Sequence, residues 1–175
     1  MAMKRIACPG CGGMFADVKG PTHRYMEASP GFWAAYGVIL AREYSDPVYR
    51  EVHRLSVDAY AAQHPGRPSP QSIRSVGLHL VRLCLLLELG LAYEKANAAM
   101  LAATKIKLAF TWLEPPPYLG PLTVADIVEL SSVDEHKQAV RAWALAVWRA
   151  WSSHHQAVRR WLPAPYSGMK GNCLK

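Results

Sequence analysis

Two cysteines near the start of the chain have the spacing of a metal-binding turn. Cys8 and Cys11 stand three residues apart in the segment "CPGCGG", so both sulfur atoms can point to one ion. Gly10, Gly12 and Gly13 permit the positive φ angles that such turns use. Two thiolates supply half of the ligands of a four-coordinate structural zinc site. The pattern predicts zinc, or another divalent transition metal, as a cofactor.

A third ligand is predicted at His23, which follows Cys11 by twelve residues in the loop "GPTHRY". This distance is within the range found between ligand pairs in small zinc modules. The fourth ligand is not evident from the sequence. Cys173 could fold back, Asp17 could offer a carboxylate, or a water molecule could complete the site.

Two alternatives to a metal remain open for this cysteine pair. A thioredoxin-like redox pair also has two cysteines three residues apart, but it needs a βαβ pattern that is absent here. The two thiols could also be free at the surface.

The histidines suggest a second metal site inside a helical bundle. Six of the seven histidines fall on or at the ends of predicted helices. His154 lies on an otherwise apolar face of the last helix, and a buried imidazole requires a hydrogen-bonding partner or a metal. We predict a metal held by His64, His79 and His154, although hydrogen-bonded histidines near helix ends are the alternative for each. A bound metal would activate water or a thiol.

Three further residues are predicted to take part in catalysis at this second site. Asp58 or His155 would move the proton, and Tyr60 would orient the substrate.

The elements that would position these residues are helices. Ser29-Pro30, Asp46-Pro47 and Ser69-Pro70 each combine a capping oxygen with a proline suited to the first helical position. Helices are therefore predicted over residues 30–44, 47–64, 70–89, 91–113 and 133–162, with a short helix after the capping residues Thr123 and Asp126.

No alternating apolar pattern of strand length stands out. The predicted fold class is all-α: an antiparallel bundle of four to five helices, preceded by a small N-terminal cysteine loop. The predicted organisation is a cysteine knuckle and loop packed on the bundle (1–28), the helical bundle (29–162) and a C-terminal tail (163–175).

Composition and charge restrict the function only loosely. The chain of 175 residues carries a net charge of +7, but its basic residues are dispersed and form no run of five. No segment has the pattern of a signal peptide or a membrane span. Four cysteines, only two of them paired by spacing, fit a reducing compartment. We expect a cytoplasmic protein.

The chain resembles an uncharacterised bacterial family, a domain of unknown function. The resemblance extends from Cys8 to Leu162 and rests on the segments "CPGCGG", "GPTHRYM", "SPGFWAAYG", "VHRLSVDAYAAQHPG" and "AWSSHHQAVRRW". Members of that family usually have cysteine at the position of Phe32. The resemblance implies a site of Cys8, Cys11, His23 and position 32, of which this chain lacks the fourth ligand. It implies no activity.

Two classes of function follow from these residues. The first is a metal-dependent enzyme that acts on a small molecule. The alternative is a nucleic-acid- or protein-binding module with a zinc knuckle, because basic residues alternate with tryptophans along the last helix. An ordinary solvated helix with its tryptophans in the core would show the same pattern. A homodimer is a related expectation.

Overall fold

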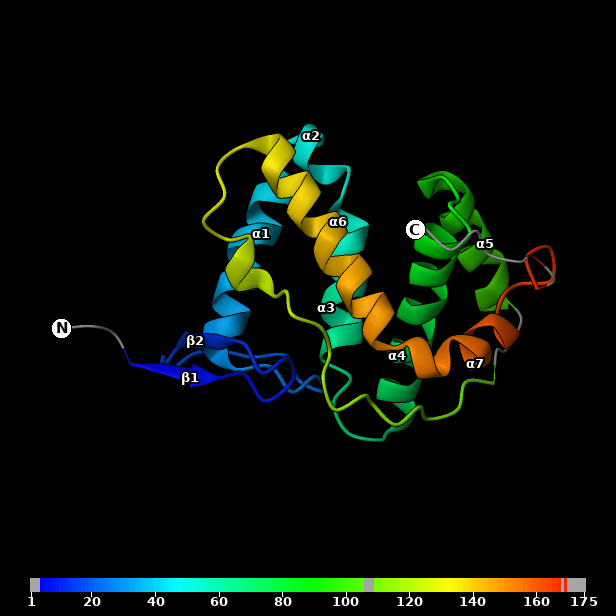
Figure 1. The fold of residues 1–175 in the computed structure, drawn as a ribbon, viewed down its shortest axis with the longest axis horizontal. Coiled ribbons are helices and arrows are strands. Elements are labelled where there is room, and N and C mark those ends of the chain that lie inside the picture. Colours follow the sequence, from blue (N-terminus) through cyan, green and yellow to red (C-terminus); the bar gives the residue numbers. More distant parts are fainter. Residues whose placement is uncertain (1–3, 106–108, 168, 170–175) are drawn as a thin grey trace.

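The computed structural model describes residues 4–105, 109–167 and 169. These residues form a mostly helical protein with one small sheet (Figure 1). The α-helices are α1 (Pro30–Ser45), α2 (Pro47–Arg50), α3 (His53–Gln63), α4 (Pro70–Leu83), α5 (Tyr93–Lys105), α6 (Val133–Ala150) and α7 (His155–Arg160). A π-helical turn, Cys84–Glu88, extends α4, and 3₁₀ turns occupy Val124–Asp126 and Ser152–His154.

The predicted helix starts are confirmed by their capping bonds. The Ser29 hydroxyl accepts a hydrogen bond from the Phe32 amide (3.1 Å), and a carboxylate oxygen of Asp46 accepts one from the Val48 amide (2.8 Å). Ser69 caps α4 in the same way. Each cap satisfies an amide that the first helical turn leaves without a partner. Thr123 and Asp126 form the predicted capping box.

Two predicted helices are interrupted, and the prediction of continuous helices there was wrong. The segment 47–64 breaks at residues 51–52, where Val52 has φ −104° and ψ 0°. The segment 133–162 breaks after Ala150, because Ser152 and Ser153 are poor interior helix residues and His154 bonds to the Glu114 carbonyl. The bundle consequently has more and shorter helices than expected.

The predicted helix over 91–113 is also shorter than expected. α5 ends at Lys105, and residues 109–113 are not helical. In this part of the chain the Phe110 ring packs edge-on to Trp161, with 5.1 Å between ring centroids. A tertiary contact, which sequence periodicity does not encode, overrides helix propensity there.

A β-hairpin was not predicted from the sequence. β1 (Arg5–Ala7) pairs antiparallel with β2 (Met14–Ala16), and Ile6 stands opposite Phe15. Strands of three residues are too short to give an alternating pattern. The loop between them carries both cysteines of the predicted knuckle, so the hairpin holds that loop against the helices.

The core lies around α3, which packs between α4 and α6. Trp143 and Trp151 are completely buried there, and the Trp151 indole nitrogen donates a hydrogen bond to the Ala62 carbonyl (3.0 Å). Gln63, also buried, donates to the carbonyls of Leu119 and Leu122. These bonds hold the connector 109–123 across the end of α3, next to the hairpin (Figure 1).

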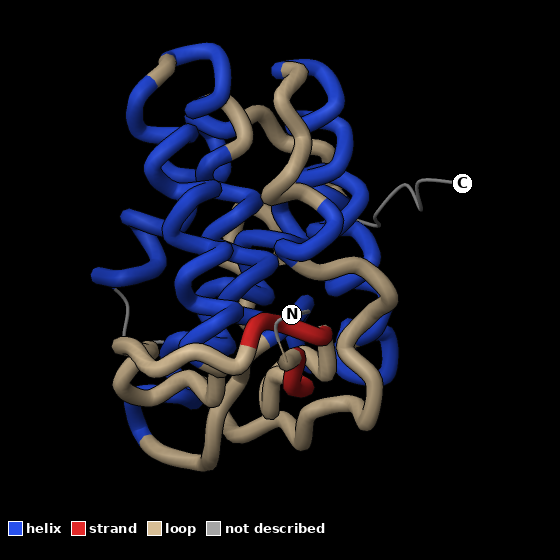
Figure 2. Tube along the Cα trace, turned by 90° about the vertical axis from the view of Figure 1, so that its left-hand side faces the viewer, coloured by secondary structure: helices blue, strands red, loops and turns tan. Residues whose placement is uncertain are grey.

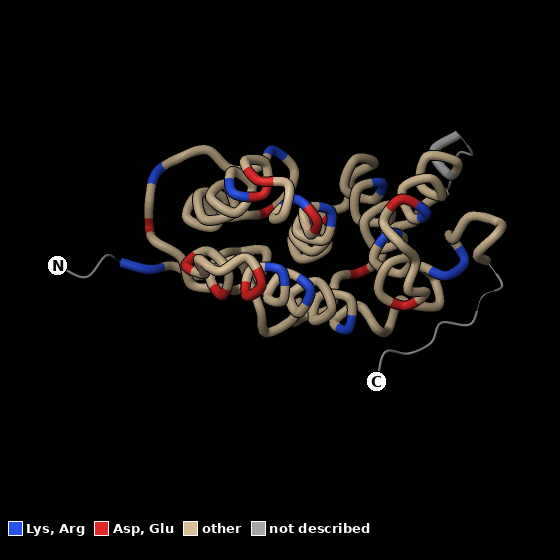
Figure 3. Tube along the Cα trace, turned by 90° about the horizontal axis from the view of Figure 1, so that it is seen from above, with Lys and Arg blue, Asp and Glu red and all other residues tan. Residues whose placement is uncertain are grey.

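The hairpin and most loops gather at one end of the helices (Figure 2). Along the helices, acidic and basic positions are interspersed (Figure 3). None of the helices in the described part of the chain is both long and apolar enough to cross a bilayer. The division into segments 1–28, 29–162 and 163–175 stays a prediction.

Candidate metal centre

Three potential metal ligands meet where the hairpin loop touches the end of α3. The sulfur atoms of Cys8 and Cys11 and one ring nitrogen of His64 all lie within 4.8 Å of one another. Cys8 and Cys11 are 1% and 8% exposed, and His64 is fully buried. Among the described residues, this is the one group of three cysteine, histidine or carboxylate side chains close enough to share an ion.

The distance between ligand atoms fits a tetrahedral ion. The Cys8 Sγ lies 3.5 Å from the His64 Nε2. Zinc–sulfur and zinc–nitrogen bonds of about 2.3 and 2.0 Å at a tetrahedral angle would separate these atoms by about 3.5 Å. The side chains therefore need little rearrangement to accept a metal.

The backbone of α3 sets the orientation of the His64 ring. Nδ1 lies 3.0 Å from the Tyr60 carbonyl oxygen, which can only accept, so Nδ1 carries the proton and donates it. In the neutral ring Nε2 then has a free lone pair, and it is this nitrogen that faces Cys8. A second hydrogen bond of this kind is typical of histidines that ligate metals.

The cysteine loop is closed by its own backbone. The Cys8 amide donates to the Gly13 carbonyl, and the Gly12 amide donates to the Cys8 carbonyl, both at 2.8 Å. Gly12 has φ +73°, a conformation that glycine adopts without strain. The Ser29 amide also points at the Cys8 sulfur (3.3 Å). The N-terminal end of α1 thus contributes a donor to the site.

The two thiols have opposite tendencies to ionise. The pKa of Cys8 is lowered, first because the Cys11 thiol donates to its sulfur and further by His64 when that ring carries both protons, although burial acts against this. The pKa of Cys11 is raised, chiefly because it is the donor of that bond, and also by burial. A metal bound by both sulfurs would displace the thiol proton that the pair shares in this hydrogen bond.

Aromatic rings enclose the buried side of the cluster. The Phe32 ring lies 4.1 Å from the His64 ring, centroid to centroid, and Tyr60 lies 5.0 Å from it. Phe32 is completely buried. This position, where the family resemblance implied a cysteine, therefore does lie beside the candidate ligands.

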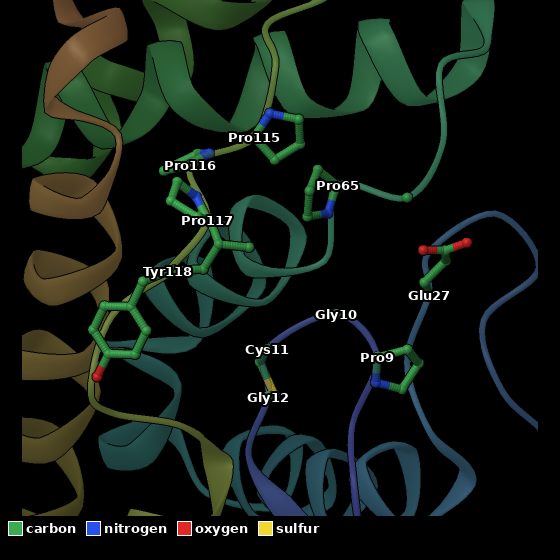
Figure 4. A pocket seen from close by; sticks show the side chains of 12 residues that line it. Pro9, Gly10, Cys11, Gly12, Glu27, Pro65, Pro115, Pro116, Pro117 and Tyr118 are labelled. Carbon is green, nitrogen blue, oxygen red and sulfur yellow. The ribbon is translucent and has the colours of Figure 1, made fainter.

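A pocket of about 560 Å³ lies beside the cluster, and Cys11 is the one candidate ligand among its lining residues (Figure 4). Pro65 and the prolines 115–117 of the connector form one side of the pocket, and Pro9 and Glu27 lie across from them. A small molecule in this pocket can approach the Cys11 side of the cluster.

The predicted third ligand, His23, is not in the cluster. Its ring packs edge-on against Tyr25 and Trp33, with 4.5 and 5.5 Å between ring centroids. Burial lowers the pKa of His23, and its Nδ1 is buried without a hydrogen-bond partner among the described residues. His64, assigned from the sequence to the second site, takes the place predicted for His23. The sequence feature that could have identified His64 as the ligand is its position at the end of a helix, directly before Pro65-Gly66.

The predicted second site of His64, His79 and His154 is not brought together. His79 Nδ1 lies 2.7 Å from an Asp58 carboxylate oxygen, which also faces Arg82 at 3.2 Å. The His154 Nε2 donates to the Glu114 carbonyl (2.8 Å) and holds the connector. These histidines thus have the hydrogen-bonded roles that were the alternative for each of them.

The predicted catalytic residues are likewise dispersed. Asp58 is engaged with His79 and Arg82, and His155 stacks on Trp148 with 3.7 Å between ring centroids. Tyr60 does lie beside the cluster, and its buried hydroxyl has no partner among the described residues. Burial, with smaller contributions from Tyr25 and Cys8, raises the pKa of this hydroxyl.

Among the described residues, no side chain predicted as a fourth ligand lies at the cluster. Asp17 pairs with Lys4 at 3.0 Å. Cys173 lies outside the described residues. Cys84, buried in the extension of α4, is a core residue.

Sequence reasoning missed a second polar centre around Glu43. This completely buried carboxylate of α1 accepts hydrogen bonds from Ser56 (2.5 Å), His53 Nδ1 (3.0 Å) and His136 Nε2 (3.1 Å). Arg42 donates to the other nitrogen of His136, which fixes that ring as the neutral tautomer. The sequence feature that could have indicated this buried centre is Glu43 itself, because it continues an apolar stripe along α1.

The comparisons with known proteins agree with the resemblance seen in the sequence. Residues 6–152 match the model of a family of unknown function (DUF5946), and the chain belongs to that family. No curated protein and no solved structure matches the chain.

Proposed function

We propose that this protein binds zinc, or a similar divalent transition metal, through Cys8, Cys11 and His64. The observation that carries the proposal is the convergence of two sulfurs and one imidazole nitrogen within 4.8 Å. Thiolate and imidazole together are ligands that zinc prefers, and a set of two cysteines and one histidine is found in catalytic zinc sites.

Three protein ligands would leave one tetrahedral position open. Cys11 lines a pocket from which a water or small molecule would reach the site, and the Phe32 ring lies beside His64. A metal there would supply Lewis-acid chemistry. We infer from this arrangement a metal-dependent enzyme acting on a small molecule, with Tyr60, whose ring lies 5.0 Å from the His64 ring, as a polar residue beside the ligands. Asp58 and His155 have other partners and are not part of this proposal.

The nucleic-acid-binding alternative has less support. Trp143, Trp148 and Trp151 are 0–4% exposed, so these rings cannot stack on bases. The basic residues of α6 then form a solvated face, as the simpler interpretation of the sequence expected.

Elemental analysis of protein purified without added metal tests the proposal. We expect about one ion per chain, lost in Cys8→Ser and in His64→Gln. Cobalt substitution adds a spectroscopic test, because thiolate–cobalt charge-transfer bands should appear with the wild type and be absent with Cys8→Ser.

Matched controls separate this site from other thiols and imidazoles. Cys84→Ser removes a buried thiol far from the cluster, and His154→Ala removes a histidine of the predicted second site. Both should retain the ion. Metal-free wild-type protein that also fails to bind added zinc would overturn the proposal, as would equal metal content in Cys8→Ser and Cys84→Ser.

A further inference from the structure

A second pocket, of about 750 Å³, lies away from the cysteine cluster. We call it the arginine pocket, after Arg50, Arg54 and Arg141, which line it from α2, α3 and α6. His53 and Tyr93 also line it. It shares no lining residue with the pocket at Cys11. Its volume is in the range of small-molecule sites.

The His53 ring is held in a defined orientation at the wall of this pocket. Its Nδ1 donates to a Glu43 carboxylate oxygen (3.0 Å), and Glu43 is completely buried behind it. The Glu43 bonds to Ser56 and His136 fix the carboxylate in turn. In the doubly protonated ring, the Nε2–H can then donate a hydrogen bond to an anionic ligand. A carboxylate behind a histidine in this way is common in binding and catalytic sites.

Positive charge dominates the lining. Of the acidic groups in the lining, Glu51 is paired with Lys137 at 2.5 Å, which leaves Glu94 against the three arginines. The Arg50 guanidinium lies over the Tyr44 ring, 5.6 Å from its centroid. Guanidinium groups offer paired donors that match the oxygens of phosphate and carboxylate. The lining is therefore suited to an oxyanion.

Tyr93 contributes an unsatisfied donor. Its hydroxyl is buried and has no hydrogen-bond partner among the described residues, and Oδ2 of the buried Asp58 is in the same condition. Burial, together with the nearby Asp58 charge, raises the pKa of Tyr93, so the hydroxyl stays protonated and can donate. An unpaired buried hydroxyl costs free energy that a bound ligand or water can recover.

We propose that the arginine pocket binds a small molecule through a phosphate or carboxylate group. Arg54 and Arg141 neutralise the anion, and the Nε2–H of the protonated His53 ring and the Tyr93 hydroxyl donate directed hydrogen bonds to it. The site is independent of the metal centre. Its distinguishing feature is that three arginines, His53 and Tyr93 line one pocket, with the buried Glu43 carboxylate hydrogen-bonded to His53 behind it.

Titration of the full chain with inorganic phosphate, and separately with succinate, tests this at constant ionic strength. Amide chemical shifts measured by NMR should change in a saturable way around residues 50–54 and 93–97. Losing a charged hydrogen bond in Arg54→Gln or Arg141→Gln should weaken binding roughly tenfold. Tyr93→Phe, which keeps the ring, should also weaken it.

Arg74→Gln is the matched control, because Arg74 is an exposed arginine on α4 outside the pocket. It should leave binding unchanged. Saturation by phosphate alone or by succinate alone would identify which oxyanion the site prefers, and either result supports the proposal. It would be overturned by an absence of saturable shifts with both anions, or by equal weakening in Arg74→Gln and Arg54→Gln.

Discussion

Phe32 lies against His64, with 4.1 Å between the ring centroids and 51° between the ring planes. The phenyl ring thus occupies space directly beside a candidate metal ligand. A cysteine there, as the family resemblance implied, would place a third sulfur next to the cluster.

Replacing Phe32 by cysteine is therefore expected to complete a four-ligand site. Zinc affinity, measured by competition with a chromophoric chelator, should rise at least tenfold, since one more thiolate contributes more than about 1.4 kcal/mol. Phe32→Ala is the control, because it leaves the same cavity without a sulfur. Equal affinities in the two variants would show that position 32 cannot reach the ion.

Gly10→Ala should disrupt the cluster without changing any ligand. A methyl group at Gly10 would lie 2.5 Å from the Glu27 carbonyl oxygen and closer still to Cδ2 of His64. The His64 ring or the cysteine loop must shift, so we expect loss of bound metal on elemental analysis. Gly37→Ala meets no atom within 4 Å and should retain the metal. Full metal content in Gly10→Ala would show that a methyl group at this position does not displace the His64 ring or the cysteine loop.

The stability of the protein should depend on the ionisation of Glu43. Burial alone would raise its pKa, but the hydrogen bonds from His136, His53 and Ser56 together lower it below the ordinary glutamate value of 4.5. The folded state therefore favours the carboxylate. This contribution to stability is present above pH 4.5 and is lost as the pH falls through the lower pKa of the folded state.

Glu43→Gln should remove this acid dependence. At neutral pH the variant should lose about 3–5 kcal/mol of unfolding free energy, as expected when one partner of a buried charged network is removed. Urea unfolding between pH 3 and 7 measures both effects, with Glu94→Gln as a control at an exposed position. If the stability of Glu43→Gln falls in acid as steeply as that of the wild type, the acid dependence does not come from Glu43.

Gly77→Ala should destabilise the fold even though alanine favours helices. A methyl group at this position in α4 would lie 2.5 Å from the Phe110 ring, which connects the segment after α5 to Trp161. Overpacking costs about 1–3 kcal/mol, more than the gain of about 1 kcal/mol in helix propensity. Thermal unfolding should show a lower midpoint than in Gly37→Ala, and a higher midpoint would mean that Phe110 moves freely.

Local signals predicted the helix starts and the cysteine turn well. Ser29, Asp46 and Ser69 cap helices because each cap depends on residues within a few positions of it. For the same reason Cys8 and Cys11 were recognised as a pair. The break near residue 151 depends in part on a contact with a distant segment, that of His154 with Glu114, and periodicity does not reveal such a contact.

The histidine partner of the cysteines could not be chosen from spacing alone. His23 is near Cys11 in sequence, whereas His64 reaches the loop only because α3 ends beside the hairpin. Glu43 is a similar case, because its partners His53 and His136 come from α3 and α6. Assemblies of this kind are determined by how helices pack, and a single sequence carries little information on that arrangement.

The 56 positions that separate Cys8 from His64 also have a consequence for how the chain holds together. An ion coordinated by both residues would act as a removable cross-link, closing a long loop at an entropic cost that grows only slowly with loop length. Metal supply would then regulate the lifetime of the hairpin against proteases, and starvation for the ion would expose the first thirty or so residues before the rest of the molecule.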